Sequence, residues 1–162
     1  MLYSAHKKSS SELLHGLGKY SQLVILLADY VLKSDSKGKL FVPRAGIIKG
    51  PNSWLEPDLF YVAASTDAYA DPKYSKHMST ADLVIEVISP GSAIYDRNTK
   101  ADTYAALGVK ELWLVDEVSG IIEVRVLEGD RYAASLVFER DDLLKSTVLS
   151  GFEMRVGDVF DS

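Results

Sequence analysis

The N-terminal part of the sequence carries apolar residues at the spacing of an amphipathic helix. Ser9, Ser10 and Ser11 offer N-caps, and Glu12 falls in the first turn. The apolar positions that follow are Leu13, Leu17, Leu23, Leu26, Leu27 and Val31. Gly38 is a suitable end signal, because glycine readily adopts the left-handed conformation that terminates helices. The pattern therefore predicts one helix between about Ser11 and the polar stretch before Gly38.

Short apolar runs separated by polar stretches predict β-strands in the middle of the chain. Residues 40–50 predict one bent strand or two short strands broken at Pro43, since proline cannot donate to a strand ladder. Residues 51–57 predict a loop, and residues 58–63 alternate as a strand does. Residues 65–81 predict a long polar loop, and loops of that length often carry function.

Two runs that are apolar on both faces flank a predicted helix. The runs are residues 82–88 and 110–116, and their pattern is typical of central strands covered on both sides. Residues 93–108 between them predict a helix that ends at Gly108. A strand, a helix and a second buried strand in this order predict a right-handed parallel βαβ unit.

The C-terminal third predicts short antiparallel strands joined by tight turns. Residues 120–129, 130–139 and 146–150 predict a meander, and residues 151–162 a short strand followed by a helical turn. Taken together, the elements predict one α/β domain over residues 1–162. Its core would be a mixed β-sheet with flanking helices and a C-terminal antiparallel meander.

The composition limits the chemistry that the chain can perform. Of its 162 residues, 47% are hydrophobic and 25% charged, the balance of a folded soluble domain. The absence of cysteine excludes disulfides, thiolate zinc sites and cysteine nucleophiles. The net charge of -5 argues against a non-specific nucleic-acid coat protein. No apolar run is long enough for a bilayer and the N-terminus lacks a signal-peptide pattern, so we expect a cytoplasmic protein without a membrane partner.

Glu86 interrupts the most apolar run of the sequence. Strand periodicity places it on one face together with Val84 and Ile88. An isolated charge at such a position would cost several kcal/mol, so a partner has to compensate for it. Asp58, at a predicted strand start, and Lys100, on the following helix, are the main candidates.

These residues permit a functional and a structural interpretation. Asp58 and Glu86, with backbone carbonyls and water, would form a hard-cation site for Mg²⁺ or Mn²⁺, whereas the three histidines lack zinc-ligand spacing. Lys100 could stabilise charge on a phosphate, and Arg97 could bind one. Alternatively, Glu86 and Lys100 form a buried structural ion pair, and Asp96 with Lys100 an ordinary i,i+4 helix pair.

The same residues carry a resemblance to a known family. The stretches that carry it are "EPDLFYV" (56–62) and "ADLVIEVISPGSAIYDRNTKADTYAALGVKELWLVD" (81–116). They resemble the Uma-type restriction endonuclease family, a domain of unknown function within the PD-(D/E)XK nuclease superfamily. The match is detailed between Pro57 and Asp116 and looser over the first helix and the C-terminal meander. The resemblance implies a restriction-endonuclease-like fold, a divalent metal and DNA as substrate.

The resemblance also implies roles for individual residues. Asp58 and Glu86, with the Val87 carbonyl, would hold Mg²⁺ or Mn²⁺. The superfamily pattern expects a lysine two residues after the second acid, where this chain has Ile88. Lys100 on the following helix is the position that matches the family's catalytic lysine. Auxiliary candidates are Glu12 on the first helix, the nearby His15 and Gln22, and Asp96 with Arg97.

Three hypotheses follow from the sequence. The leading one is a metal-dependent endonuclease that hydrolyses DNA phosphodiester bonds, with Asp58, Glu86 and Lys100 as catalytic residues. The second is a catalytically inactive nuclease-fold module for binding or assembly, and the third is a purely structural Glu86–Lys100 pair. A homodimer would let two sites face two DNA strands. Its interface is expected at Trp54, Phe60, Tyr61 and the meander.

Overall fold

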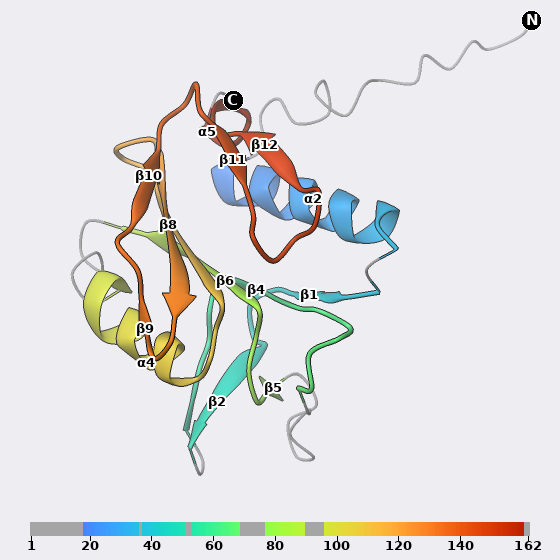
Figure 1. Cartoon of the computed structure of the whole chain (residues 1–162). Coiled ribbons are helices and arrows are strands. Elements are labelled where there is room, and N and C mark those ends of the chain that lie inside the picture. The colour runs from blue at the N-terminus through green and yellow to red at the C-terminus, as the bar shows by residue number, and fades with distance from the viewer. Residues whose placement is uncertain (1–17, 36, 51–52, 69–76, 90–95, 161–162) are drawn as a thin grey trace, which may run out of the picture.

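A computed structural model describes residues 18–35, 37–50, 53–68, 77–89 and 96–160 of the chain (Figure 1). The predicted start of the first helix, together with Glu12 and His15, lies outside these residues. So do parts of the long loop at 65–81 and of the segment that follows Glu86. Within the described ranges, no helix is both long and apolar enough to cross a membrane.

A seven-stranded mixed sheet forms the centre of the fold. Its strands run in the order β1-β4-β6-β7-β8-β10, and β9 pairs with β8 beside this path. β6 and β7 are parallel in a register from Leu83 opposite Glu111 to Ile88 opposite Asp116, and the other pairs are antiparallel. The strands are β1 (Lys39–Phe41), β4 (Leu59–Val62), β6 (Leu83–Ile88), β7 (Glu111–Asp116), β8 (Ile121–Glu128), β9 (Arg131–Tyr132) and β10 (Leu136–Phe138).

Two layers cover the faces of this sheet (Figure 1). On one face lie α2 (Lys19–Lys33), α5 (Gly157–Phe160) and the antiparallel pair β11 (Leu143–Lys145) and β12 (Glu153–Arg155). On the other face lie the π-helical segment η1 (Asp96–Lys100), α4 (Ala101–Ala106) and a small sheet. The small sheet has the order β3-β2-β5, with β2 (Gly46–Gly50), β3 (Ser53–Leu55) and β5 (His77–Met78).

Alternation along the central strands divides the core between these two faces. In β6, Leu83 and Ile85 pack toward α2, whereas Val84 and Ile88 pack toward α4. Leu23 and Leu27 of α2 are buried against the first face because residues four apart share one side of a helix. The central strands are therefore covered on both sides, as their apolar runs predicted.

The mixed α/β architecture confirms the predicted fold class, and most predicted elements are present. Residues 40–50 form two strands, β1 and β2, on either side of Pro43. The chain between the two parallel strands ends its helix near Gly108, which has φ +76°. This is the left-handed conformation for which glycine is suited.

Four local predictions were wrong. The predicted loop at residues 65–81 contains a short strand, β5, which pairs with β2. Residues 51–57 contain a strand, β3, because Trp54 pairs with Ile48 of β2 and packs edge-on against His77. Residues 146–150 form a turn rather than a strand, since the Ser146 hydroxyl accepts the backbone N–H groups of the residues two and three positions later. Phe60 and Tyr61 are 1% and 2% exposed, so they pack in the core and cannot supply a dimer interface.

Two buried carboxylates, one directly before β6 and one at the first residue of β7, contact neighbouring segments. Asp82 accepts hydrogen bonds from the Ala63 N–H at 2.7 Å, from Thr66 and from Lys110 Nζ at 2.6 Å. Glu111 accepts the Trp113 Nε1–H at 2.6 Å and the Thr147 N–H at 2.7 Å, and also the Thr147 hydroxyl. The contacts between Glu111 and Thr147 fix the turn at 146–150 against the sheet.

We expect Glu111→Ala to lower the free energy of unfolding by about 3 kcal/mol, because it leaves buried donors without an acceptor at about 1–3 kcal/mol each. Urea denaturation followed by circular dichroism measures this difference. The matched control is Glu153→Ala, which removes an exposed glutamate 3.3 Å from Lys145 and should change stability by less than about 1 kcal/mol. Equal losses in the two variants would contradict the anchoring role of Glu111.

Candidate active site

Glu86 lies in the middle of β6 on the face that α4 covers, and it is 3% exposed. Its two carboxylate oxygens have different partners. The Tyr104 hydroxyl donates to Oε1 at 2.5 Å, and Lys100 Nζ lies 3.1 Å from Oε2. Both partners come from one short helical stretch, so the compensation that the buried charge requires is supplied by η1 and α4.

Asp58 immediately precedes β4 and approaches Glu86 from the neighbouring strand. Leu59 of β4 pairs with Ile85 of β6, and one further step of this antiparallel register places Asp58 beside Glu86. Asp58 Oδ2 accepts the Val87 N–H at 2.7 Å, while the Asp58 carbonyl accepts the Tyr20 hydroxyl at 3.1 Å. The side chain of Asp58 is thus held by β6, and the main chain of Asp58 by α2.

The electrostatics of the site are dominated by the burial of Glu86. Burial raises the pKa of Glu86 to about 7, against an ordinary value of 4.5. The Tyr104 hydrogen bond and the Lys100 charge lower this pKa, and the negative charge of Asp58 raises it further. Burial and then Asp58 also raise the pKa of Tyr20. The site therefore favours the arrival of positive charge beside Glu86.

The helical stretch above Glu86 is irregular at the point where it delivers its side chains. Asp96–Lys100 is π-helical, and α-helix begins at Ala101. Short π-helical turns occur frequently at functional sites. Lys100 and Tyr104 are four residues apart and reach the same carboxylate, while Tyr104 is fully buried.

The structure brings together three of the residues selected from the sequence, namely Asp58, Glu86 and Lys100. It adds Tyr104, which sequence reasoning had not proposed as a site residue, although its position one helical turn after Lys100 was a usable signal. The side chains of Asp96 and Arg97, like Glu12 and His15, lie outside what the structure describes. Gln22 is buried within α2, near the turn that contacts Asp58 through Tyr20.

The donor set fits a hard divalent cation. Among the described residues, no group of three or more His, Cys, Asp or Glu side chains is placed to hold a metal ion. Mg²⁺ does not require one, because it usually keeps several waters and binds through one or two carboxylates plus substrate phosphate. Val87 directs its N–H toward Asp58, and in an extended strand the carbonyl of a residue points the same way as its N–H. Asp58, Glu86 and this carbonyl are all oxygen donors of the kind that Mg²⁺ and Mn²⁺ prefer.

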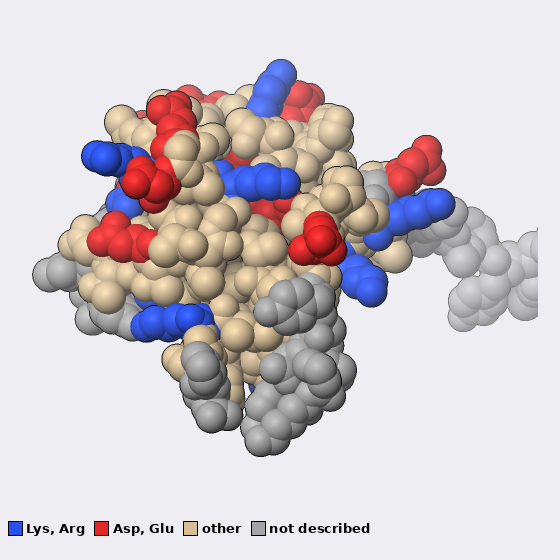
Figure 2. Space-filling model, turned by 60° about the horizontal axis from the view of Figure 1, so that its bottom comes forward, with Lys and Arg blue, Asp and Glu red and all other residues tan. Residues whose placement is uncertain are grey.

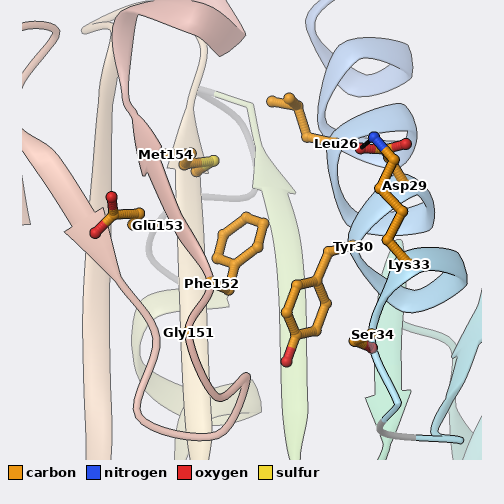
Figure 3. Close-up of a pocket in the computed structure, with 9 residues that line it drawn as sticks. All are labelled: Leu26, Asp29, Tyr30, Lys33, Ser34, Gly151, Phe152, Glu153 and Met154. Carbon is orange, nitrogen blue, oxygen red and sulfur yellow. Dashed lines mark hydrogen bonds and ion pairs between the residues drawn. The ribbon is translucent and has the colours of Figure 1, made fainter.

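Two pockets lie away from these carboxylates. One, of about 390 Å³, lies between residues 26–34, at the C-terminal end of α2, and residues 151–154 (Figure 3). The other, of about 440 Å³, is formed by residues 119–121 and 139–142. Neither pocket is lined by Asp58, Glu86 or Lys100, so the ionisable groups converge outside both.

Figure 2 shows Lys and Arg side chains scattered among Asp and Glu over the face that it draws. The mixture agrees with the net charge of -5 for the whole chain. This face therefore has no single basic patch that would attract a polyanion.

The raised pKa of Glu86 predicts how stability changes with pH in the presence of EDTA. Between about pH 4.5 and 7 the native state holds a proton that the unfolded chain has released, so stability falls as the pH rises through this window. The stabilisation is complete below about 4.5 and lost above about 7, amounting to roughly 3 kcal/mol. Urea denaturation at several pH values should show this decline in the wild type but not in Glu86→Gln. If wild type and Glu86→Gln showed the same dependence of stability on pH, the raised pKa of Glu86 would be contradicted. The control variant Glu153→Gln should show the same dependence as the wild type.

Comparisons with known proteins place these residues in a family. No match was found among curated proteins. A crystal structure described as "a putative nuclease belonging to DUF820" from Anabaena variabilis ATCC 29413 superimposes with a TM-score of 0.70. It is 16% identical, and the alignment covers 95% of this chain and 82% of that one, which shows a shared fold. The family model Uma2, described as "Putative restriction endonuclease", matches residues 8–157. With nearly its whole length matched, the chain belongs to the Uma2 family.

Proposed function

We propose that this protein is a metal-dependent endonuclease that hydrolyses phosphodiester bonds in DNA. The observation that carries the proposal is the convergence of Asp58 and Glu86 on neighbouring strands, with Lys100 3.1 Å from Glu86. Membership in a family described as restriction endonucleases supports the same reaction class. Two carboxylates beside one lysine are suited to phosphoryl chemistry, which depends mainly on positioning and electrostatics.

Asp58 and Glu86 would hold Mg²⁺ or Mn²⁺, with the Val87 carbonyl as a further oxygen donor. A bound divalent cation supplies Lewis-acid polarisation of a phosphate oxygen and makes water more acidic. Since the chain carries a net charge of -5, its carboxylates repel the DNA backbone. Asp58 and Glu86 can therefore approach a phosphate closely only when their charge is neutralised.

Lys100 would act on the substrate rather than remain a structural counter-ion. Its side chain is 21% exposed, so its amine has a path to solvent that Glu86, with a side chain 4% exposed, does not have. A lysine amine on a flexible stem can move from Glu86 to a nearby phosphate oxygen, where it would offset charge that develops during hydrolysis. Ile88, at the position of the superfamily's strand lysine, is buried in the core and cannot perform this role.

A second candidate function is a nuclease-fold module that binds or assembles without cleaving. The observation that favours it is that Glu86 already has two compensating partners, Tyr104 and Lys100, within the fold. Such a carboxylate can be stable without a metal. The two candidates differ in whether the protein binds a divalent cation through Glu86.

Plasmid cleavage in Mg²⁺ or Mn²⁺ tests the catalytic proposal. We expect the wild type to nick or linearise plasmid DNA, and Asp58→Ala and Glu86→Ala to lose at least about 100-fold in rate, since each removes a metal ligand. Asp29→Ala removes an exposed carboxylate paired with Lys33 on α2 and should cleave like the wild type. Equal cleavage by all four proteins would sink the proposal.

Isothermal titration with Mn²⁺ separates the two candidate functions. A catalytic site should bind Mn²⁺ in the wild type and lose most of that binding in Glu86→Gln, because the ligand's charge is removed. Absence of binding in the wild type would instead support the inactive module. The cytoplasmic location and the homodimer stay predictions.

A further inference from the structure

The two oxygens of Glu86 are held in different ways. Oε1 accepts a 2.5 Å hydrogen bond from Tyr104, a side chain with no exposed surface. Oε2 faces Lys100 at 3.1 Å, and the Lys100 side chain is 21% exposed. A buried tyrosine ring has little freedom to move, because the packed core fixes its position. A lysine stem with four carbons can turn its amine elsewhere at small cost.

Asp58 shows the same division between its oxygens. Its Oδ2 accepts the Val87 N–H at 2.7 Å, a backbone donor that the pairing of β6 keeps in place. Each carboxylate is therefore fixed through one oxygen by a donor that the fold cannot readily move. The other oxygen of each remains as the one that can exchange partners, namely Oδ1 of Asp58 and Oε2 of Glu86.

The following inference rests on the proposed function. We propose that Tyr104 is a positioning residue, which binds Oε1 of Glu86 and thereby leaves Oε2 for the divalent cation. Lys100 Nζ, 3.1 Å from Oε2, would leave this oxygen to the cation. Tyr104 touches neither substrate nor cation, and acts through the orientation of Glu86. Groups that orient a metal ligand in this way change metal affinity by about 10- to 100-fold when removed.

Tyr104→Phe removes one hydroxyl and keeps the ring that fills the core. The chain offers a matched control in Tyr132→Phe, since the Tyr132 hydroxyl donates to the Val109 carbonyl at 2.9 Å and its ring packs on the same side of the sheet. Each variant loses a buried or partly buried hydrogen bond, but of the two tyrosines Tyr104 is the one that contacts Glu86. A general structural effect would therefore appear in both.

Titration calorimetry with Mn²⁺ alone, on the full chain, measures the difference. We expect Tyr104→Phe to bind Mn²⁺ about 10- to 100-fold more weakly than the wild type, and Tyr132→Phe to bind within about twofold of it. Circular dichroism should show both variants folded. Equal Mn²⁺ affinity in Tyr104→Phe and Tyr132→Phe would overturn the proposed role of Tyr104. Absence of Mn²⁺ binding in the wild type would instead overturn the metal site of the proposed function.

A crystal structure of the wild type with Mn²⁺ tests the same inference without a substitution. We expect the ion on Glu86 Oε2, the Tyr104 hydroxyl still on Oε1, and Lys100 Nζ beyond ion-pair distance from the carboxylate. Coordination through Oε1, or a Tyr104 hydroxyl displaced from it, would contradict the inference even if Tyr104→Phe failed to fold.

Discussion

The negative charge of Glu86 within the sheet is the constraint on which the surrounding arrangement depends. Parallel pairing of β6 with β7 fixes where this carboxylate lies, and its position in the strand leaves it only 3% exposed. Because a buried charge without partners costs several kcal/mol, the layer above the strand must supply compensation. The η1–α4 stretch supplies it from one side with Lys100 and Tyr104, so the helix and the strand are matched through electrostatics as well as packing.

Asp82 and Glu111 show what a buried acid looks like when it serves only the fold. Both lie at the starts of their strands, and their hydrogen-bond donors come from loops and neighbouring residues that they hold in place. Asp58 likewise accepts a backbone N–H, that of Val87, but it also places a second negative charge beside Glu86, whose pKa is raised by burial and further by Asp58. Placing like charges together lowers stability, and such arrangements are typical of functional sites.

Much of this could be predicted from the order of residues along the chain. Apolar runs on both sides of a helical segment specify a parallel pair of strands with the helix packed over them. This arrangement places Lys100 on the helix above Glu86 on the strand. The hydrogen bond from Tyr104 to Glu86 could not be predicted in this way, because the phase of the helix depends on where π-helical geometry gives way to α-helix. The hydrogen bond from the Val87 N–H to Asp58 and the strand β3 were also not predicted. Both are set by pairing between strands, which a local pattern does not specify.

The π-helical turn before α4 has a consequence for how this site tolerates change in length. Each residue added to or removed from a helix rotates everything beyond it by about 100°. A deletion within residues 96–99 that was not absorbed by conversion of the wide turn to α-helix would rotate Lys100 and Tyr104 together away from Glu86. Residues 96–99 of η1 therefore act as a spacer whose length keeps the Lys100 amine and the Tyr104 hydroxyl directed at one carboxylate.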